Sequence, residues 1–240
     1  MEEIRIIEGP NYVHLFSGGL DSTYGLLKLA KDIEKGRKRK GSIQPVFIDY
    51  GHFAASIEWR QSQKIAEFIG TRVRAPSVVR TPIRINLKSD LFAWCHNVAF
   101  TGKEVGEITC EIQNRNMVLL SILLSYLLAC AQNQGIERAS FEIYGGFKEG
   151  EMGDCSHEFF SALTDAFAIY QKGYPMKVVL LPPSSRAQVF AKLRRLLHGS
   201  QSDLKVVLSM ITSCYASIDG TQCEKCYKCR KIAEEKRKTR

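Results

Sequence analysis

The sequence lacks the features that mark membrane, disordered or fibrous proteins. Of its 240 residues, 45% are hydrophobic and 25% are charged, which fits neither a disordered nor a fibrous chain. The longest apolar run, 117–131, is interrupted by Ser121 and Ser125 and is too short for a membrane span, so it predicts a buried helix. The first residues do not show the basic-then-apolar order of a signal peptide. We expect a cytoplasmic protein with no membrane segment.

Two common phosphate-binding and acyl-transfer motifs are also absent. No Gly-x-x-x-x-Gly-Lys-Ser/Thr sequence occurs, which excludes a Walker-type loop. Leu15 stands two positions before Ser17, where a nucleophile elbow needs glycine. These absences disfavour kinase-type and hydrolase-type chemistry.

Acidic residues are fewer than basic ones, 25 against 34, which gives a formal net charge of +9. The excess is concentrated in the residues from 224 onward and in a basic run at 35–40. Aromatic residues do not alternate with these basic residues, so no stacking platform for nucleic-acid bases is indicated. We interpret both runs as solvated surface, with nucleic-acid contact as the less favoured alternative.

Short apolar runs alternate with helical patterns, which predicts an α/β domain with a parallel sheet and crossover helices. Strands are expected over 12–16, 46–48, 73–79, 140–144 and 177–181. Helices are expected over 23–34, 56–69 (closed by Gly70), 115–132, 156–170, 185–197 and 203–210. Gly145 and Gly146 are expected to form a turn, and the stretch 81–112 has no clear period. We divide the chain into an α/β domain, 1–200, and a small C-terminal lobe, 201–240.

A glycine-rich loop, SGGLDS at 17–22, follows the first predicted strand. Gly18 and Gly19 allow backbone amides to turn inward without a Cβ in the way, and the helix that follows adds the partial positive charge of its amino end. The loop therefore predicts a phosphate-binding nest. The alternative is an ordinary strand-to-helix turn in which Ser17 or Asp21 caps the helix.

Four of the eight cysteines lie close together near the end of the sequence, with the spacing Cys-x8-Cys-x2-Cys-x2-Cys: Cys214, Cys223, Cys226 and Cys229. Thiolates this close repel one another unless a cation neutralises them, and four sulfurs fill a tetrahedral zinc shell. The spacing predicts a structural zinc site in the C-terminal lobe. A redox pair or an iron–sulfur cluster is the alternative.

Taken together, the loop and the cysteine spacing resemble the 7-cyano-7-deazaguanine synthase family of N-type ATP pyrophosphatases. The resemblance spans nearly the whole chain and implies a Rossmann-like, adenine nucleotide alpha hydrolase-like fold. Its further matches are Asp49-Tyr50-Gly51, Asn114-Arg115-Asn116, Asp154-Cys155 and Ser213-Cys214-Tyr215.

The resemblance implies that ATP activates the carboxylate of 7-carboxy-7-deazaguanine or a close analogue, for queuosine biosynthesis. The carboxylate attacks the α-phosphate, and ammonia converts the acyl adenylate into an amide. A second adenylation then gives the nitrile. The implied cofactors are ATP, magnesium and zinc, and the implied assembly is a homodimer.

The resemblance also implies roles for individual residues. Asp21 would position the pyrophosphate portion of ATP or a magnesium ion, and Arg115 would offset developing negative charge. ATP contacts are implied for Phe16, Ser17, Gly18, Gly19, Leu20, Asp21, Ser22, Thr23, Asp49, Tyr50 and Gly51. Substrate contacts are implied for Asn114, Arg115, Asn116, Gly145, Asp154 and Arg186. From the residues alone, Arg115 is equally a surface-paired residue at a helix start, and Asn114 and Asn116 are equally caps.

The sequence departs from the family pattern where the family recognises its substrate. His52 stands in place of glutamine, Arg186 in place of lysine, and the segment 145–155 differs from the family's Gly-x-Asn and Tyr-Pro-Asp-Cys. Two alternatives therefore stay open. One is a relative of the kind found in antiviral defence loci, which would deliver the deazaguanine to an amine of a protein. The other is a tRNA-thiolating enzyme whose basic tail would bind tRNA.

Overall fold

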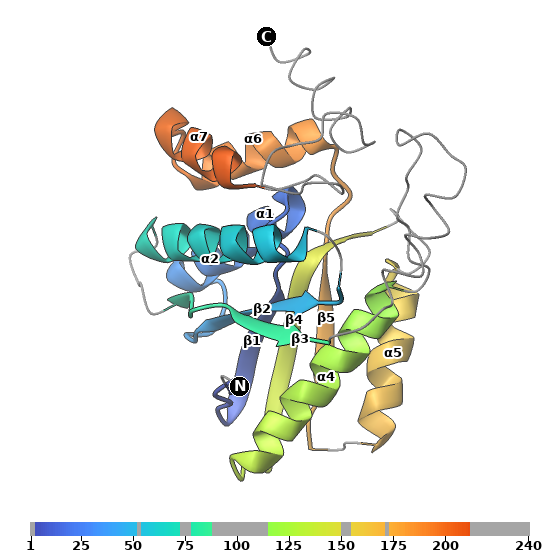
Figure 1. Ribbon diagram of the computed structural model, residues 1–240. Helices are drawn as coiled ribbons and strands as arrows, with labels where there is room; N and C mark the ends of the chain where they lie inside the picture. Colours follow the sequence, from blue (N-terminus) through green and yellow to red (C-terminus); the bar gives the residue numbers. More distant parts are fainter. Residues whose placement is uncertain are drawn as a thin grey trace, which may run out of the picture.

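The computed structural model describes residues 3–51, 54–72, 78–87, 115–149, 155–170 and 173–211. Five strands form one parallel sheet in the order β3-β2-β1-β4-β5 (Figure 1). The strands are β1 Gly9–Leu15, β2 Ile43–Asp49, β3 Ile83–Asn86, β4 Ala139–Lys148 and β5 Met176–Leu181. This strand order is that of a Rossmann-like sheet, so the predicted α/β class is confirmed.

Helices cover both faces of the sheet (Figure 1). On one face lie α4 (Arg115–Asn133) and α5 (His157–Tyr170). On the other lie α1 (Leu20–Glu34), α2 (Ala55–Arg72), α6 (Arg186–Leu196) and α7 (Gln201–Met210). Each face has its own apolar core, one centred on the leucines of α4 and one on those of α1. Because both faces are covered, every residue of β2 is buried.

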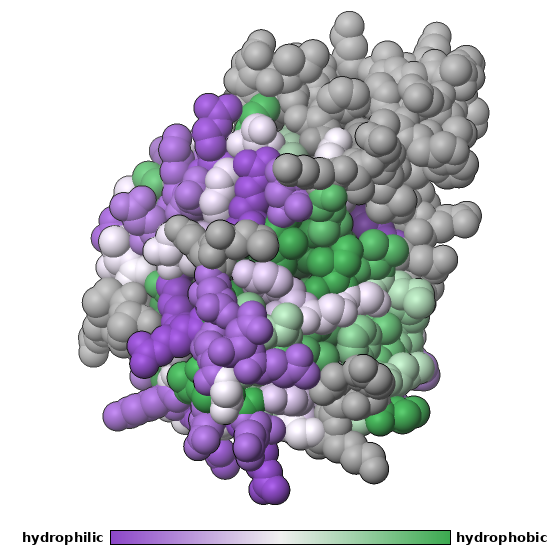
Figure 2. All heavy atoms as spheres, turned by 60° about the horizontal axis from the view of Figure 1, so that its bottom comes forward, coloured by the Kyte–Doolittle hydropathy of each residue, from purple (hydrophilic) through white to green (hydrophobic). Residues whose placement is uncertain are grey.

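Helix α4 is a core helix, as the apolar run 117–131 predicts. Leu120, Leu123, Leu124 and Leu127 are fully buried against the sheet and α5. Among the described residues, α4 is the one helix long and apolar enough to cross a membrane by length and composition alone. Figure 2 shows hydrophobic residues gathered on the side where α4 and α5 lie in Figure 1, and hydrophilic residues on the side of α2 and α7.

The predicted third strand, 73–79, lies mostly outside the described residues, and Val78 and Val79 belong to no strand of the sheet. The third strand is β3, which falls inside the stretch 81–112 that shows no clear period. Val79 forms only an isolated bridge with Ile43, and residues 73–77 lie outside the described residues. β3 has four residues and is an edge strand, too short for its alternation of buried and exposed side chains to stand out in the sequence.

Two predictions about glycines are wrong. Gly145 and Gly146 do not form a turn but lie inside β4, which continues to Lys148 through a register shift. Gly70 does not follow the end of α2; it is buried within that helix, which ends at Arg72. A glycine in a strand often marks a bulge or the close approach of another backbone, and both features are present in β4.

His14 is fully buried on β1, beneath α1. A Cβ at Gly25 of α1 would lie 3.0 Å from its Nε2, so glycine is what lets the helix pack onto the ring. Neither ring nitrogen has a hydrogen-bond partner within the described part of the chain. Burial lowers the pKa of His14 to about 3, against a smaller opposing effect of nearby backbone groups. The imidazole is therefore neutral at physiological pH.

We expect the buried imidazole of His14 to make the protein sensitive to mild acid. Its folded pKa lies below that of a free histidine, so the unfolded chain takes up a proton first as the pH falls below about 6.5. This contribution to stability is complete above that pH and is lost as the pH falls toward the folded pKa. Between pH 7.5 and 5.5 we expect it to lower the free energy of unfolding by about 1 kcal/mol. Urea unfolding at both values measures this, and His14→Leu should remove that part of the loss. An equal loss in the variant would contradict the assignment.

Candidate functional site

The carboxyl ends of the five parallel strands meet along one edge of the sheet. Between β1 and β4 the direction of winding reverses, because the chain runs outward from β1 to β3 and then from β4 to β5 on the other side. Open α/β sheets bind ligands at this switch point. Here β1 leads into the glycine-rich loop and α1, and β4 ends at Lys148.

The loop holds an unusual backbone conformation against α2. Gly18 has φ +69°, and a Cβ there would lie 3.3 Å from the backbone nitrogen of Ser62. Phe16, Leu20 and Thr23 are buried, and the backbone N–H of Phe16 donates to the carbonyl of Val46 at 2.8 Å. The ends of the loop are thereby anchored to the core, while Gly18 is buried against α2 and Ser17 is exposed.

The amino end of α1 is open. Gly19 is the N-cap residue, and no side-chain hydrogen bond caps it. The Ser22 hydroxyl donates back to the Gly19 carbonyl at 3.1 Å and lies 3.2 Å from the Ser17 hydroxyl. Ser17 accepts a hydrogen bond from the Gly19 N–H at 3.4 Å, as the alternative interpretation of the sequence expects in part, but Gly19 is itself the N-cap and offers no side chain to the amides of the first turn. Uncapped amides at a helix start, together with the helix dipole, favour an anion.

Strand β4 forms the other wall of this site. A Cβ at Gly146 would lie 3.1 Å from the backbone nitrogen of Ser22 and 3.4 Å from the Cβ of Asp21. The strand can run this close to the loop only because the position is glycine. Gly145, predicted to contact substrate, precedes it in the same strand.

An ion pair joins the loop to the end of β4. The Lys148 Nζ lies 3.0 Å from the Asp21 Oδ1, with the lysine side chain 10% and the aspartate side chain 32% exposed. Sequence reasoning missed Lys148, because reading the two glycines of β4 as a turn placed it beyond the strand. The signal was available in a lysine directly after a Gly-Gly-Phe segment. The pair sets a carboxylate and a cation beside the open end of α1.

Asp49 ends β2 and is also held by a cation. It is buried, forms an ion pair with Arg84 of β3, and its Oδ1 accepts a hydrogen bond from the Gly51 N–H at 2.9 Å. These contacts fix the turn at 49–51, where Gly51 has φ +85° and Tyr50 packs against the core. Arg84 is a second residue that sequence reasoning missed, because no periodic pattern marked its strand.

The segments implied to bind substrate meet at the starts of α4 and α5. Asn116 is buried, and its Nδ2 donates to the Cys155 Sγ at 3.1 Å. Arg115, half-buried, is the first residue of α4. The structure thus joins the Asn-Arg-Asn and Asp-Cys segments, although Asn114 and Asp154 themselves lie outside the described residues.

Arg186 begins α6, directly after the end of β5 at the same edge of the sheet. Its guanidinium lies over the ring of Phe190, 5.8 Å from the centroid. Cys214, Cys223, Cys226 and Cys229 lie outside the described residues, so the zinc site stays a prediction. The residues that are described contain no group of three or more histidine, cysteine or acidic side chains arranged to hold a metal ion.

A parallel sheet with an open glycine loop at its switch point defines a nucleotide-binding α/β protein. The sequence matches the family described as "QueC: Queuosine biosynthesis protein QueC" over residues 11–237, and the chain belongs to this family. The match confirms the resemblance to 7-cyano-7-deazaguanine synthases and indicates an ATP-using enzyme of queuosine biosynthesis. Comparison with curated proteins finds no match.

We expect Gly18→Ala to weaken nucleotide binding far more than Gly135→Ala. Both glycines have φ close to +70°, so both substitutions carry the same left-handed backbone cost of about 1 kcal/mol. Only at position 18 does the new Cβ meet a neighbour, the Ser62 backbone nitrogen, whereas nothing lies within 4 Å at position 135. Calorimetric titration with a non-hydrolysable ATP analogue should show affinity reduced on the order of tenfold for Gly18→Ala alone. Equal affinities would mean that the packing of the loop against α2 does not shape the site.

Proposed function

We propose that the chain uses ATP to activate the carboxylate of 7-carboxy-7-deazaguanine, or of a close analogue, for capture by ammonia. The observation that carries the proposal is the open amino end of α1, bordered by Gly18, by Gly146 and by the Asp21–Lys148 ion pair. This arrangement suits a polyphosphate, because it combines unpaired amides, a helix dipole and a nearly buried lysine without a side chain in the way.

Different residues of the site are proposed to bind ATP and the carboxylate substrate. The amides of 18–22 and Lys148 are proposed to hold the phosphates that leave as pyrophosphate. Magnesium would enter with ATP and neutralise part of its charge, with Asp21 as the acidic residue of the loop. Arg115, at the start of α4, is proposed to offset negative charge on the substrate carboxylate or on the transferred nucleotidyl group.

ATP is needed because hydroxide is a poor leaving group from a carboxylic acid, whereas AMP is a good leaving group from the acyl adenylate. A carboxylate oxygen attacks the α-phosphorus, and the bond to the β-phosphate oxygen breaks to release pyrophosphate. Ammonia attacks the activated carbon, AMP departs and a proton is lost, which gives the amide. The amide oxygen attacks the α-phosphorus of a second ATP, a second pyrophosphate and a proton leave, and elimination of AMP with the remaining N–H proton gives the nitrile.

The departures that suggest the conjugating alternative fall at 145–155, and the basic tail of the thiolating alternative lies outside the described residues. Within β4, Gly146 approaches the loop and Phe147 packs against Phe160 of α5, with 5.2 Å between the ring centroids, and residues 150–154 are outside the described residues. We keep the zinc-bearing lobe, the homodimer and the cytoplasmic location as predictions.

Product analysis with ATP, 7-carboxy-7-deazaguanine and ammonia tests the proposed function. We expect nitrile and pyrophosphate, with two AMP formed per nitrile. Amide as the only product would favour the conjugating alternative. No consumption of the acid would contradict the proposal. Asp21→Ala should abolish AMP formation while the protein stays folded by circular dichroism. Asp165→Ala, an exposed acid on α5, is the matched control and should keep full activity.

Lys148→Met tests the cation of the site. We expect the rate of AMP formation to fall on the order of tenfold or more, because the variant removes the charge beside the departing pyrophosphate. Lys148→Arg should restore part of the rate, and Lys177→Met, an exposed lysine on β5, should leave it unchanged. Full activity in Lys148→Met would show that Lys148 serves only to pair with Asp21.

A further inference from the structure

Asp49, the last residue of β2, is a buried acid that is held at three of its atoms. Its carbonyl accepts from the Leu87 N–H at 2.9 Å, its Oδ1 accepts from the Gly51 N–H at 2.9 Å, and its Oδ2 forms the ion pair with Arg84. Burying a carboxylate is costly without a cation, so Arg84 is what allows an acid at this position. Both carboxylate oxygens have partners within the chain, and the carboxylate therefore serves to hold the turn 49–51.

Arg84 lies on the face of the sheet that α2 covers. The isoleucines on either side of it in β3 belong to the core on the α4 side. Because successive side chains of a strand point to opposite faces, Arg84 points the other way, as does its partner in register, Phe47 of β2. Phe47 packs against Trp59 of α2, with 5.8 Å between the ring centroids, and the glycine loop contacts the same helix. The ion pair and the glycine loop are thus on the same face.

The walls of the glycine loop favour one direction for the rest of a bound nucleotide. On the side of β4, the strand approaches the loop at Gly146, and the Lys148–Asp21 pair follows. On the other side, β2 pairs with β1 in parallel, so the turn 49–51 follows β2 directly beside the loop. A nucleotide whose phosphates lie at the amino end of α1 therefore extends its sugar and base toward this turn.

We propose that Arg84 is a positioning residue for the nucleoside part of ATP, which acts through Asp49 and the turn 49–51 without touching the nucleotide. The inference rests on the proposed use of ATP at the glycine loop. Arg84 donates to Asp49 through Nη2, and its Nε has no hydrogen-bond partner within the described part of the chain. The contact depends on one charged nitrogen and not on a two-pronged fork, so lysine can reproduce part of it.

Two ligands separate the two ends of the nucleotide. A non-hydrolysable ATP analogue engages the phosphate and nucleoside contacts together, and inorganic tripolyphosphate engages the phosphate contacts alone. Each is titrated by calorimetry against the wild type, Arg84→Met, Arg84→Lys, Asp49→Asn and the double variant Asp49→Asn/Arg84→Met. Arg138→Met is the control, because Arg138 is exposed and precedes β4 at the opposite edge of the sheet.

The double variant protects the test against a failure to fold. Arg84→Met alone leaves a buried carboxylate without its cation. Asn at position 49 keeps an oxygen that can accept from the Gly51 N–H but carries no charge, so the double variant leaves no buried charge unpaired. Circular dichroism checks that each variant is folded.

We expect Arg84→Met to lower the affinity for the ATP analogue on the order of tenfold and to leave tripolyphosphate affinity within about twofold of the wild type. Arg84→Lys should recover part of the loss, and the control should show none. Asp49→Asn and the double variant should have the same affinity for the analogue, because a residue that acts only through Asp49 has no further effect once that carboxylate is gone.

Three results would overturn the proposal: unchanged affinity for the analogue in Arg84→Met, an equal loss of tripolyphosphate affinity, or a further loss in the double variant relative to Asp49→Asn. The last two would mean that Arg84 contacts the nucleotide itself. Failure of the wild type to bind either ligand would instead contradict the proposed ATP site, so the two failures are distinguishable.

Discussion

The site depends on the close approach of β4 to the amino end of α1. Because residue 146 is glycine, the backbone of β4 can lie close to Ser22. A Cβ at this position would lie 3.1 Å from the Ser22 backbone nitrogen. This approach carries β4 along the wall of the loop and sets Lys148 at 3.0 Å from Asp21. If β4 lay farther from α1, Lys148 would lie farther from the amides proposed to bind phosphate. Packing between a strand and a helix thereby decides the electrostatics of the site.

The loop, its helix and the buried helix α4 could be predicted from the sequence because local signals mark them. Adjacent glycines after an apolar run indicate a strand-to-helix loop, and leucines at helical spacing indicate which face of a helix is buried. The structure bears out both for α1 and α4. The expected ends of most helices also fall close to those observed.

The partners of the loop could not be predicted in the same way, because each depends on a contact between distant segments. A pair of glycines is compatible with a turn and with a close backbone approach, and only the position of Ser22 decides between them. Arg84 lies in a four-residue edge strand without a readable period, so its ion pair with Asp49 had no local signal. The two cations that neutralise predicted site carboxylates are thus the residues that sequence reasoning missed.

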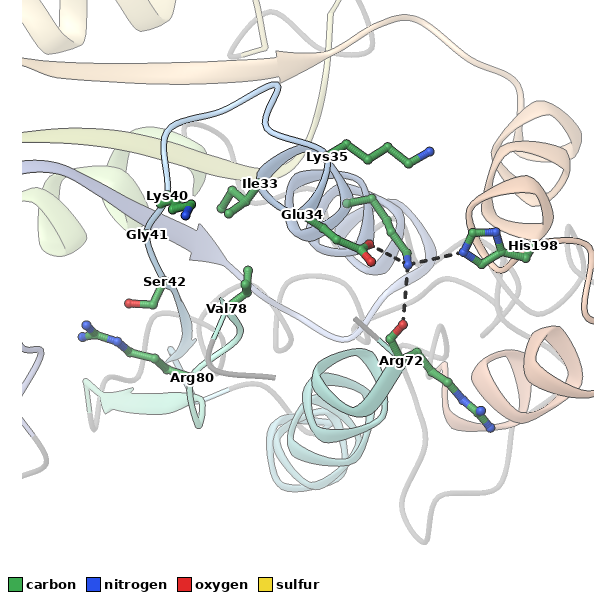
Figure 3. Close-up of a pocket in the computed structure, with 11 residues that line it drawn as sticks. Ile33, Glu34, Lys35, Lys40, Gly41, Ser42, Arg72, Val78, Arg80 and His198 are labelled. Atoms are coloured by element: carbon green, nitrogen blue, oxygen red, sulfur yellow. Dashed lines mark hydrogen bonds and ion pairs between the residues drawn. The ribbon is translucent and has the colours of Figure 1, made fainter. Parts of the chain in front are cut away.

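The two ends of α1 carry opposite partial charges from the helix dipole. At its amino end, the helix dipole and uncapped amides attract an anion, and Lys148 adds to that field. At its carboxyl end the dipole favours cations, and Lys31 lies in the last turn, where it pairs with Glu34 (Figure 3). The dipole supplies only about half an elementary charge and its effect fades within one turn, so the charge at each end is set mainly by side chains, by Lys148 at one end and by the Lys31–Glu34 pair at the other.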